Sequence, residues 1–75
     1  MVQPDKTLDI RGAAEKRAVQ LAREVLRPMR SGQVLKLVTG DQQPRPGIIA
    51  LCREEGYDLL DTMRDDAVFA FLIRR

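Results

Sequence analysis

The order of predicted elements in the first half of the chain constrains the fold more than any other feature. The stretch LDIRGAAEKRAVQLAREVL, residues 8–26, combines an alternating segment, a glycine and an amphipathic segment. Residues 6–10 predict a half-buried strand that ends at Gly12, and residues 13–27 predict a helix. The β-branched run VLKLVT, residues 34–39, predicts a second strand. A strand, a helix and a strand in this order favour two parallel strands joined by the helix.

The second half adds one more helix and two more strands. The segment GDQQPRP predicts a loop. A short helix is expected between this loop and Gly56, which is a natural C-terminal cap. The connection RDDA is short enough for a hairpin between the last two strands, which should therefore be antiparallel. The expected bounds are 40–46 for the loop, 47–55 for the helix, and 57–63 and 68–74 for the strands, joined by 64–67.

The order β-α-β-α-β-β predicts a two-layer α/β (α+β) sandwich. Two helices can cover one face of a four-stranded mixed sheet, and the other face stays open. On residues 34–39, Val34 and Val38 are expected on the open face, opposite Leu35 and Leu37, where a partner or a second copy could cover them. The first helix should end near Pro28, which removes a backbone donor. Its expected core face is Ala14, Ala18, Leu21, Ala22, Val25 and Leu26.

Length and composition indicate one small globular domain. The chain has 75 residues, of which 44% are hydrophobic and 32% charged, so it is not typical of a disordered protein. Residues 1–5 are expected to be a flexible lead-in to a single domain spanning residues 1–75. Neither an apolar leader nor an apolar run of about 20 residues is present. We therefore expect a cytoplasmic protein that does not act at a membrane and is a monomer or weak homodimer.

The chemistry-bearing residue types are scarce. The chain contains no His and a single Cys, Cys52, so an intramolecular disulfide, the CxxC spacing and the Ser-His and Cys-His dyads are excluded. No set of residues has the spacing of a metal site, and no phosphate-loop pattern occurs around Gly40. We therefore expect no cofactor, and the sequence leans away from an enzyme without deciding the question.

Several segments together resemble the small sulfur-carrier proteins of the TusA (SirA-like) family. They are TLDIRG, RPMRSGQVLKLVTGD, IIALCREEGYDLL and FAFLIRR, and with the first helix they cover nearly the whole chain. The resemblance implies the βαβαββ sandwich. It also implies a sulfurtransferase activity, in which a persulfide is accepted from a cysteine desulfurase and passed to a protein partner of a sulfur relay.

The resemblance also marks a departure at the position that carries the chemistry. The family's signature is a Cys-Pro-x-Pro motif that opens the first helix, where the helix N-terminus favours a thiolate. This chain keeps the entry, residues 8–12, but the Cys position is Glu15 and the two Pro positions are Lys16 and Ala18. Cys52 matches a Cys often found on the second helix of relatives, which is not the sulfur acceptor.

The predicted function is therefore a non-catalytic, protein-binding or regulatory relative of the sulfur carriers. Its expected partner surface comprises Arg11, Glu15, Lys16, Arg23 and Arg27. A polar stripe of Lys16, Gln20, Arg23, Arg27 and Arg30, opposite the apolar face of the helix, supports this surface. The alternative is a purely structural role. Glu15 would then stabilise the first helical turn as an acidic residue, and the stripe would be the solvent-exposed face of the helix.

Two other functions remain open from the sequence. In the first, the protein is a sulfur carrier that acts through Cys52 or in a complex, although the apolar spacing of Cys52 with Ile48 and Leu51 indicates a core residue. In the second, the stripe binds RNA, since residues 1–36 hold eight Lys and Arg against four Asp and Glu. A stacking platform would need aromatic side chains on the open face. Phe69 and Phe71 share one face of a strand, and Tyr57 lies on the other predicted strand.

Overall fold

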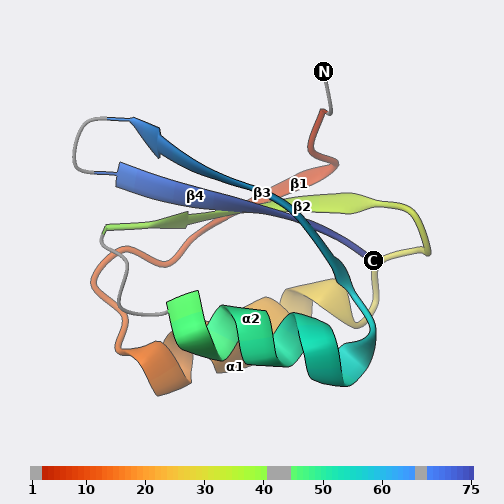
Figure 1. The fold of residues 1–75 in the computed structure, drawn as a ribbon, viewed down its shortest axis with the longest axis horizontal. Coiled ribbons are helices and arrows are strands. Elements are labelled where there is room, and N and C mark those ends of the chain that lie inside the picture. Colours follow the sequence, from red (N-terminus) through yellow and green to blue (C-terminus); the bar gives the residue numbers. More distant parts are fainter. Residues whose placement is uncertain (1–2, 41–44, 66–67) are drawn as a thin grey trace.

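The computed structural model describes residues 3–40, 45–65 and 68–75. Four strands and two helices follow each other in the expected order β-α-β-α-β-β (Figure 1). They are β1 (Lys6–Asp9), α1 (Glu15–Leu26), β2 (Val34–Thr39), α2 (Arg45–Glu55), β3 (Asp58–Asp65) and β4 (Val68–Arg74). The predicted fold class is confirmed.

The strands form one mixed sheet in the order β1-β2-β4-β3. β1 and β2 are parallel, with Leu8 opposite Leu37, as the connection through α1 requires. β4 lies antiparallel to both β2 and β3, with Phe71 opposite Leu37 in the first pair. The predicted antiparallel pairing of the last two strands is confirmed, whereas the tip of their connection lies outside the described residues.

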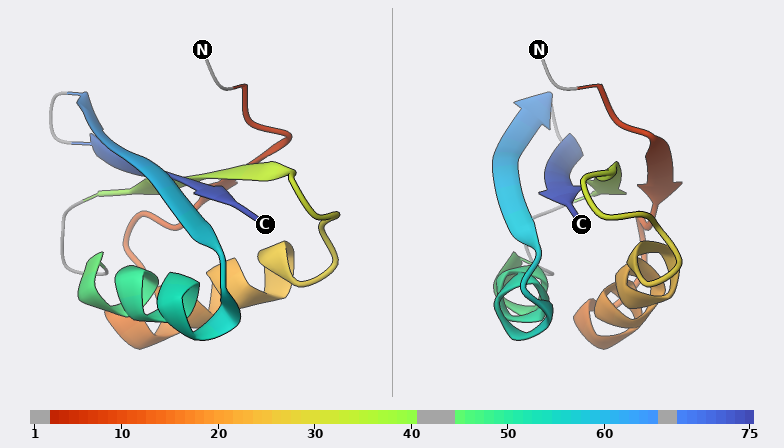
Figure 2. Two further views of the ribbon diagram at one scale, coloured as in Figure 1. Left: turned by 45° about the vertical axis from the view of Figure 1, so that its right-hand side comes forward. Right: turned by 90° about the vertical axis from the view of Figure 1, so that its right-hand side faces the viewer.

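Both helices lie on one face of the sheet. Figure 2 shows α1 beneath the half of the sheet formed by β1 and β2, and α2 beneath β3. The two helices lie side by side and begin at the same end of the molecule, the end at which β2 finishes (Figure 1). This arrangement brings the first turns of two helices together at one edge.

The core fills the space between the helical layer and the sheet. Ala18, Ala22 and Leu26 are spaced by four residues, and all three are fully buried, so they form the face of α1 that packs inward. In the strands every second side chain points toward the helices, because successive side chains point to opposite faces of the sheet. The buried cluster is Ile10, Ala18, Ala22, Leu26, Met29, Leu35, Leu37, Ile48, Leu51, Cys52, Phe71 and Ile73.

The helix boundaries follow their capping residues. α1 ends at Leu26, just before Pro28, as predicted. Gly56 has a φ of 75°, and the N–H of Tyr57 donates to the carbonyl of Cys52 at 2.8 Å, which is the bond of a Schellman cap. The prediction that α2 starts at residue 47 was wrong. It begins at Arg45, since Pro46 fits a first helical turn where its missing N–H has no partner to lose.

No helix covers the other face of the sheet, as predicted (Figure 2), but Val34, Ala70 and Leu72 on that face are each at most 8% exposed. Because Leu35 and Leu37 belong to the core, Val34 and Val38 point to the other face. Phe71 lies in the core, and Phe69 shares its face of β4, so both aromatic rings are on the helical side. The arrangement that would give a stacking platform on the open face is therefore absent among the described residues.

Neither helix in the described part of the chain has the length and apolar character needed to cross a membrane.

Candidate functional site

The start of α1 is where the sequence predicted a partner surface. Gly12 turns the chain with a φ of 87° after β1, and Ala14 forms the N-cap in an extended conformation. The assignment of Ala14 to the core face was wrong, because the residue lies before the first turn and is exposed. Its side chain makes no capping hydrogen bond. Glu15 is therefore the first helical residue, and its carboxylate lies at the positive end of the helix dipole.

Glu15 also reaches the first turn of the other helix. Its Oε2 accepts a hydrogen bond from the backbone N–H of Gly47 at 3.2 Å. The first N–H groups of a helix have no partner within the helix, so this carboxylate satisfies a donor that α2 leaves open. One side chain thus interacts with the positive ends of both helices.

The close approach of the two helices leaves little room for a side chain at position 47. A Cβ atom built there would lie 2.6 Å from Val19 Cγ2 and 3.2 Å from Glu15 Cγ. Real Cβ atoms essentially never lie within 3.0 Å of another atom, so the Val19 side chain or one of the helices would have to shift. Gly47 was not among the predicted site residues, because its contact with Glu15 joins positions 32 residues apart. The only sequence signal was a glycine within a predicted helical segment.

Arg11 precedes this site in the sequence, but its side chain is paired with Asp9. Its guanidinium forms an ion pair with Asp9, with Nη2 2.7 Å from Oδ2, and its Nε donates to the same carboxylate. These hydrogen bonds lower the pKa of the Asp9 carboxyl below its ordinary value. Arg11 lies on the connection between β1 and α1, where its side-chain carbons lie near Gly40. It does not line the hollow that Glu15 lines.

The other predicted residues line two adjoining shallow hollows along α1. A hollow at the start of the helix is lined by Glu15, Lys16, Val19, Gln20, Arg23 and Gly47. A second hollow toward its end is lined by Gln20, Arg23, Glu24, Arg27 and Pro28. The two share Gln20 and Arg23, and we call them together the α1 groove. Arg30, the last residue of the predicted stripe, lines neither hollow.

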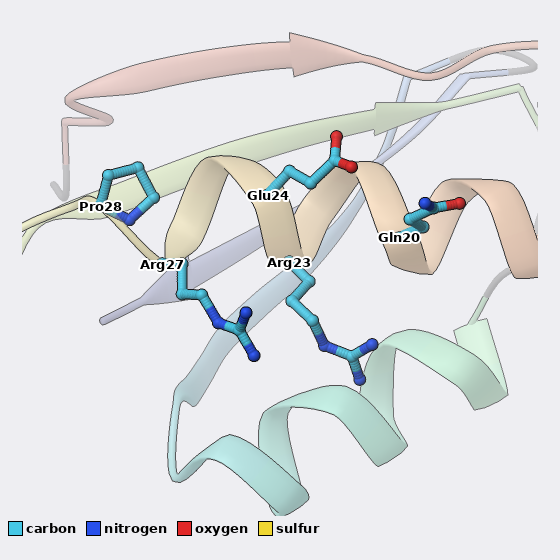
Figure 3. Close-up of a pocket in the computed structure, with 5 residues that line it drawn as sticks. All are labelled: Gln20, Arg23, Glu24, Arg27 and Pro28. Atoms are coloured by element: carbon cyan, nitrogen blue, oxygen red, sulfur yellow. The ribbon is translucent and has the colours of Figure 1, made fainter.

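Two cations of the stripe, Arg23 and Arg27, extend toward α2 rather than pointing directly away from the core (Figure 3). Figure 3 shows the side chains of Arg23 and Arg27 extending toward α2, whereas Glu24 and Pro28 lie on the other side of the helix. Arg23 is half-buried. Its guanidinium is 3.8 Å from Glu54 and 3.9 Å from Glu55, both in the last turn of α2. The sequence pattern located the cations on one side of α1 but not the helix that they face.

Cys52 lies away from this groove surface and is 4% exposed. It belongs to the core cluster. Burial, and secondarily the charge of Asp58, raises the pKa of the Cys52 thiol to about 11. Since the thiolate is the nucleophilic form, burial and the raised pKa both disfavour reaction of this thiol at neutral pH. Within the described residues, no three His, Cys, Asp or Glu side chains are grouped so that they could hold a metal ion.

Comparisons with known proteins identify the family. The family model "Sulfurtransferase TusA" matches residues 6–75. Two proteins of Neisseria meningitidis, from a serogroup A and a serogroup B strain, are each 30% identical over 69 residues, covering 92% of this chain and 93% of theirs. Both are named "Putative sulfur carrier protein". The chain belongs to the TusA sulfurtransferase family.

A solved structure supports the fold. The crystal structure of a SirA-like protein from Desulfitobacterium hafniense superimposes with a TM-score of 0.79, covering 92% of this chain and 95% of that one. The sequence identity is 20%, so this likeness concerns the fold alone. The predicted family and architecture are both confirmed.

Proposed function

We propose that this protein is a TusA-like domain that binds a protein partner of sulfur-relay type without carrying sulfur itself. The proposal rests on one observation: neither of the two positions at which a carrier could hold sulfur offers an exposed thiol. The start of α1 holds Glu15, which has no sulfur atom. The one thiol of the chain, Cys52, is buried in the core with its pKa raised to about 11.

Glu15 supports binding in place of transfer. Its carboxylate keeps a negative charge where the family resemblance locates a thiolate, and it ties that charge to Gly47. A carboxylate can also act as a nucleophile or a general base, but such chemistry usually pairs it with a general acid from the protein. Among the described residues, no acid–base partner side chain hydrogen-bonds to Glu15. A fixed negative charge is therefore suited to recognition by a partner that otherwise meets a charged sulfur.

Intact-protein mass spectrometry tests this function. The protein is incubated with a cysteine desulfurase, its pyridoxal cofactor and cysteine, beside a family member that has the Cys-Pro-x-Pro motif. We expect the relative to gain the mass of sulfur and this protein to gain none. A sulfur gain that disappears in Cys52→Ala would overturn the proposal, because it would make Cys52 a carrier.

A binding measurement tests whether the protein binds a partner of the sulfur relay. The desulfurase and the competent family member are each immobilised, and this protein is passed over them. We expect binding to one of them to persist in Cys52→Ala and to weaken in Glu15→Ala. Equal binding by Glu15→Ala would remove Glu15 from the partner surface.

A further inference from the structure

The α1 groove contains cations whose hydrogen-bonding capacity is unused. Arg23 Nε is buried and has no hydrogen-bond partner. The oxygens of Glu54 and Glu55, at 3.8 and 3.9 Å, lie beyond hydrogen-bond distance. The Arg23 side chain is nevertheless 36% exposed, so an incoming acceptor can reach its guanidinium and replace these long contacts with shorter bonds.

The neighbouring cations in the groove are also available. In the part of the chain that the structure describes, the side chains of Lys16 and Arg27 form no ion pair or hydrogen bond, and both are exposed. Arg23 and Arg27 are four residues apart, so they are separated by about 6 Å along the helix axis. Alternate residues of an extended chain are separated by about 6.6 Å, which is a similar spacing.

We propose that the α1 groove binds an acidic segment of a protein partner, in which two carboxylates two residues apart pair with Arg23 and Arg27. This inference rests on the proposed function and specifies the chemistry of the partner. Guanidinium groups bind carboxylates through two parallel hydrogen bonds, a geometry that would satisfy the open donors of Arg23. Lys16 extends the positive charge toward the start of α1.

The acidic side chains around the groove favour a protein segment over a nucleic acid. Glu15 and Glu24 line the groove, and Glu54 and Glu55 border it at Arg23. A nucleic-acid strand carries a negative charge at every phosphate, so some of its phosphates would meet these carboxylates. A peptide can restrict its carboxylates to the positions of the two arginines.

Glu54 and Glu55 act as internal competitors in this arrangement. Binding must exchange their weak attraction for Arg23 against shorter bonds to the partner. Removing their charge should therefore tighten the binding of an acidic segment, whereas removing the charge of Arg23 or Arg27 should weaken it. These opposite effects come from two sides of the same groove and separate a specific pairing from a general charge effect.

A titration followed by amide NMR shifts tests the proposal. The probe is a short capped peptide in which glutamate alternates with alanine, and the matched control peptide has glutamine in place of glutamate. We expect the acidic peptide to shift amides along α1 and the end of α2. Its affinity should fall about 5-fold in Arg23→Gln and in Arg27→Gln, and rise about 2-fold in Glu54→Gln/Glu55→Gln.

Controls distinguish the possible outcomes. Arg27 is exposed, so Arg27→Gln should fold normally even if Arg23→Gln does not. Lys36→Gln removes the same charge from β2, outside the groove, and should leave the affinity unchanged. Equal shifts with the glutamine peptide, or unchanged affinity in Arg27→Gln, would overturn the proposal. Tighter binding of oligouridine than of the acidic peptide would assign the groove to RNA instead.

The outcome is independent of the test of sulfur transfer. Sulfur on Cys52 would overturn the proposed function while leaving acidic docking intact. Absence of peptide binding with no sulfur gain would overturn only the acidic partner.

Discussion

The first turn of α1 and the second half of α2 hold the two side chains on which the proposed function rests. Glu15 is exposed and charged, and its carboxylate interacts with the first turns of both helices. Cys52 is 4% exposed and neutral at ordinary pH. A sulfur carrier needs a thiolate that is exposed and stabilised. In this chain the helix N-terminus that would stabilise a thiolate is at Glu15, whereas the thiol is at Cys52.

The largest expected effect comes from moving the thiol from one region to the other. In Glu15→Cys/Cys52→Ala the only thiol lies at the start of α1, where solvent and the helix dipole favour the thiolate. A thiol with the ordinary pKa of about 8.5 has roughly 300-fold more thiolate at neutral pH than one with a pKa of about 11. We expect alkylation by iodoacetamide at neutral pH to be at least 100-fold faster, as an order of magnitude, than that of Cys52 in the folded wild type.

Denatured samples provide the control for this comparison. Once unfolded, the two thiols should react at similar rates, because neither retains its folded environment. Similar rates in the folded proteins would show that Cys52 is accessible and would remove the contrast between the regions.

The next effect concerns the pH dependence of stability. Because the pKa of Cys52 is raised in the folded protein, the unfolded chain loses this proton first, and deprotonation favours unfolding. The stabilisation is complete below about pH 8.5 and is lost as pH rises through about 11. Urea denaturation from about pH 8 to 11 should therefore show a smaller loss in Cys52→Ala than in wild type, by roughly 3 kcal/mol. Parallel profiles would contradict the buried, neutral thiol.

A third effect tests how closely the two helices approach at the Glu15 end. Gly47→Ala would bring Cβ to 2.6 Å from Val19 Cγ2, so the Val19 side chain or the helices must shift. We expect a loss of about 1–2 kcal/mol in the free energy of unfolding, despite the higher helix propensity of alanine. Thermal or urea denaturation measures it.

A double variant identifies the cause of that loss. Val19→Ala removes the methyl group that the new Cβ would meet. The combined effect of Val19→Ala and Gly47→Ala should therefore be smaller than the sum of the single effects. Additive effects would mean that the collision with Val19 does not limit the approach of the helices.

The smallest effect concerns the charge of Glu15. Glu15→Gln keeps an oxygen acceptor for the N–H of Gly47 but removes the charge near the two helix starts. We expect a loss of about 0.5–1 kcal/mol in urea denaturation, decreasing with added salt. Lys16→Gln, one residue later and without an ion pair in the described chain, should change the stability less. Equal effects would mean that the position, rather than the carboxylate, is responsible.

Much of the fold could be predicted because its signals are local. Residues 34–39 are apolar and β-branched, and they form β2 with the expected bounds. Gly56 and Pro28 mark helix ends through their own backbone geometry. The first turns of both helices were less predictable. Ala14 has the periodicity of a core residue but lies outside the helix, and Pro46 fits a loop as well as a first turn.

The candidate site was only partly predictable for a related reason. Glu15, Lys16, Arg23 and Arg27 share one side of α1 through helical spacing, and the structure brings them into one groove. That groove also depends on α2, which supplies Gly47 at one end and Glu54 and Glu55 beside Arg23. No periodicity within α1 could indicate these contacts, because they depend on how two separate helices are placed.

The sequence by itself determined the order of elements, the single core, the family resemblance and the presence of Glu15 at the position where that resemblance predicts a thiol. Each of these follows from residue identity or from spacing within one segment. Only the tertiary structure decided that Glu15 binds the first turn of α2, that Arg23 faces glutamates across the helix pair and that the one thiol is buried. Those properties arise because the two helices pack side by side on one face of the sheet. They therefore depend on distances between residues that are far apart in the chain.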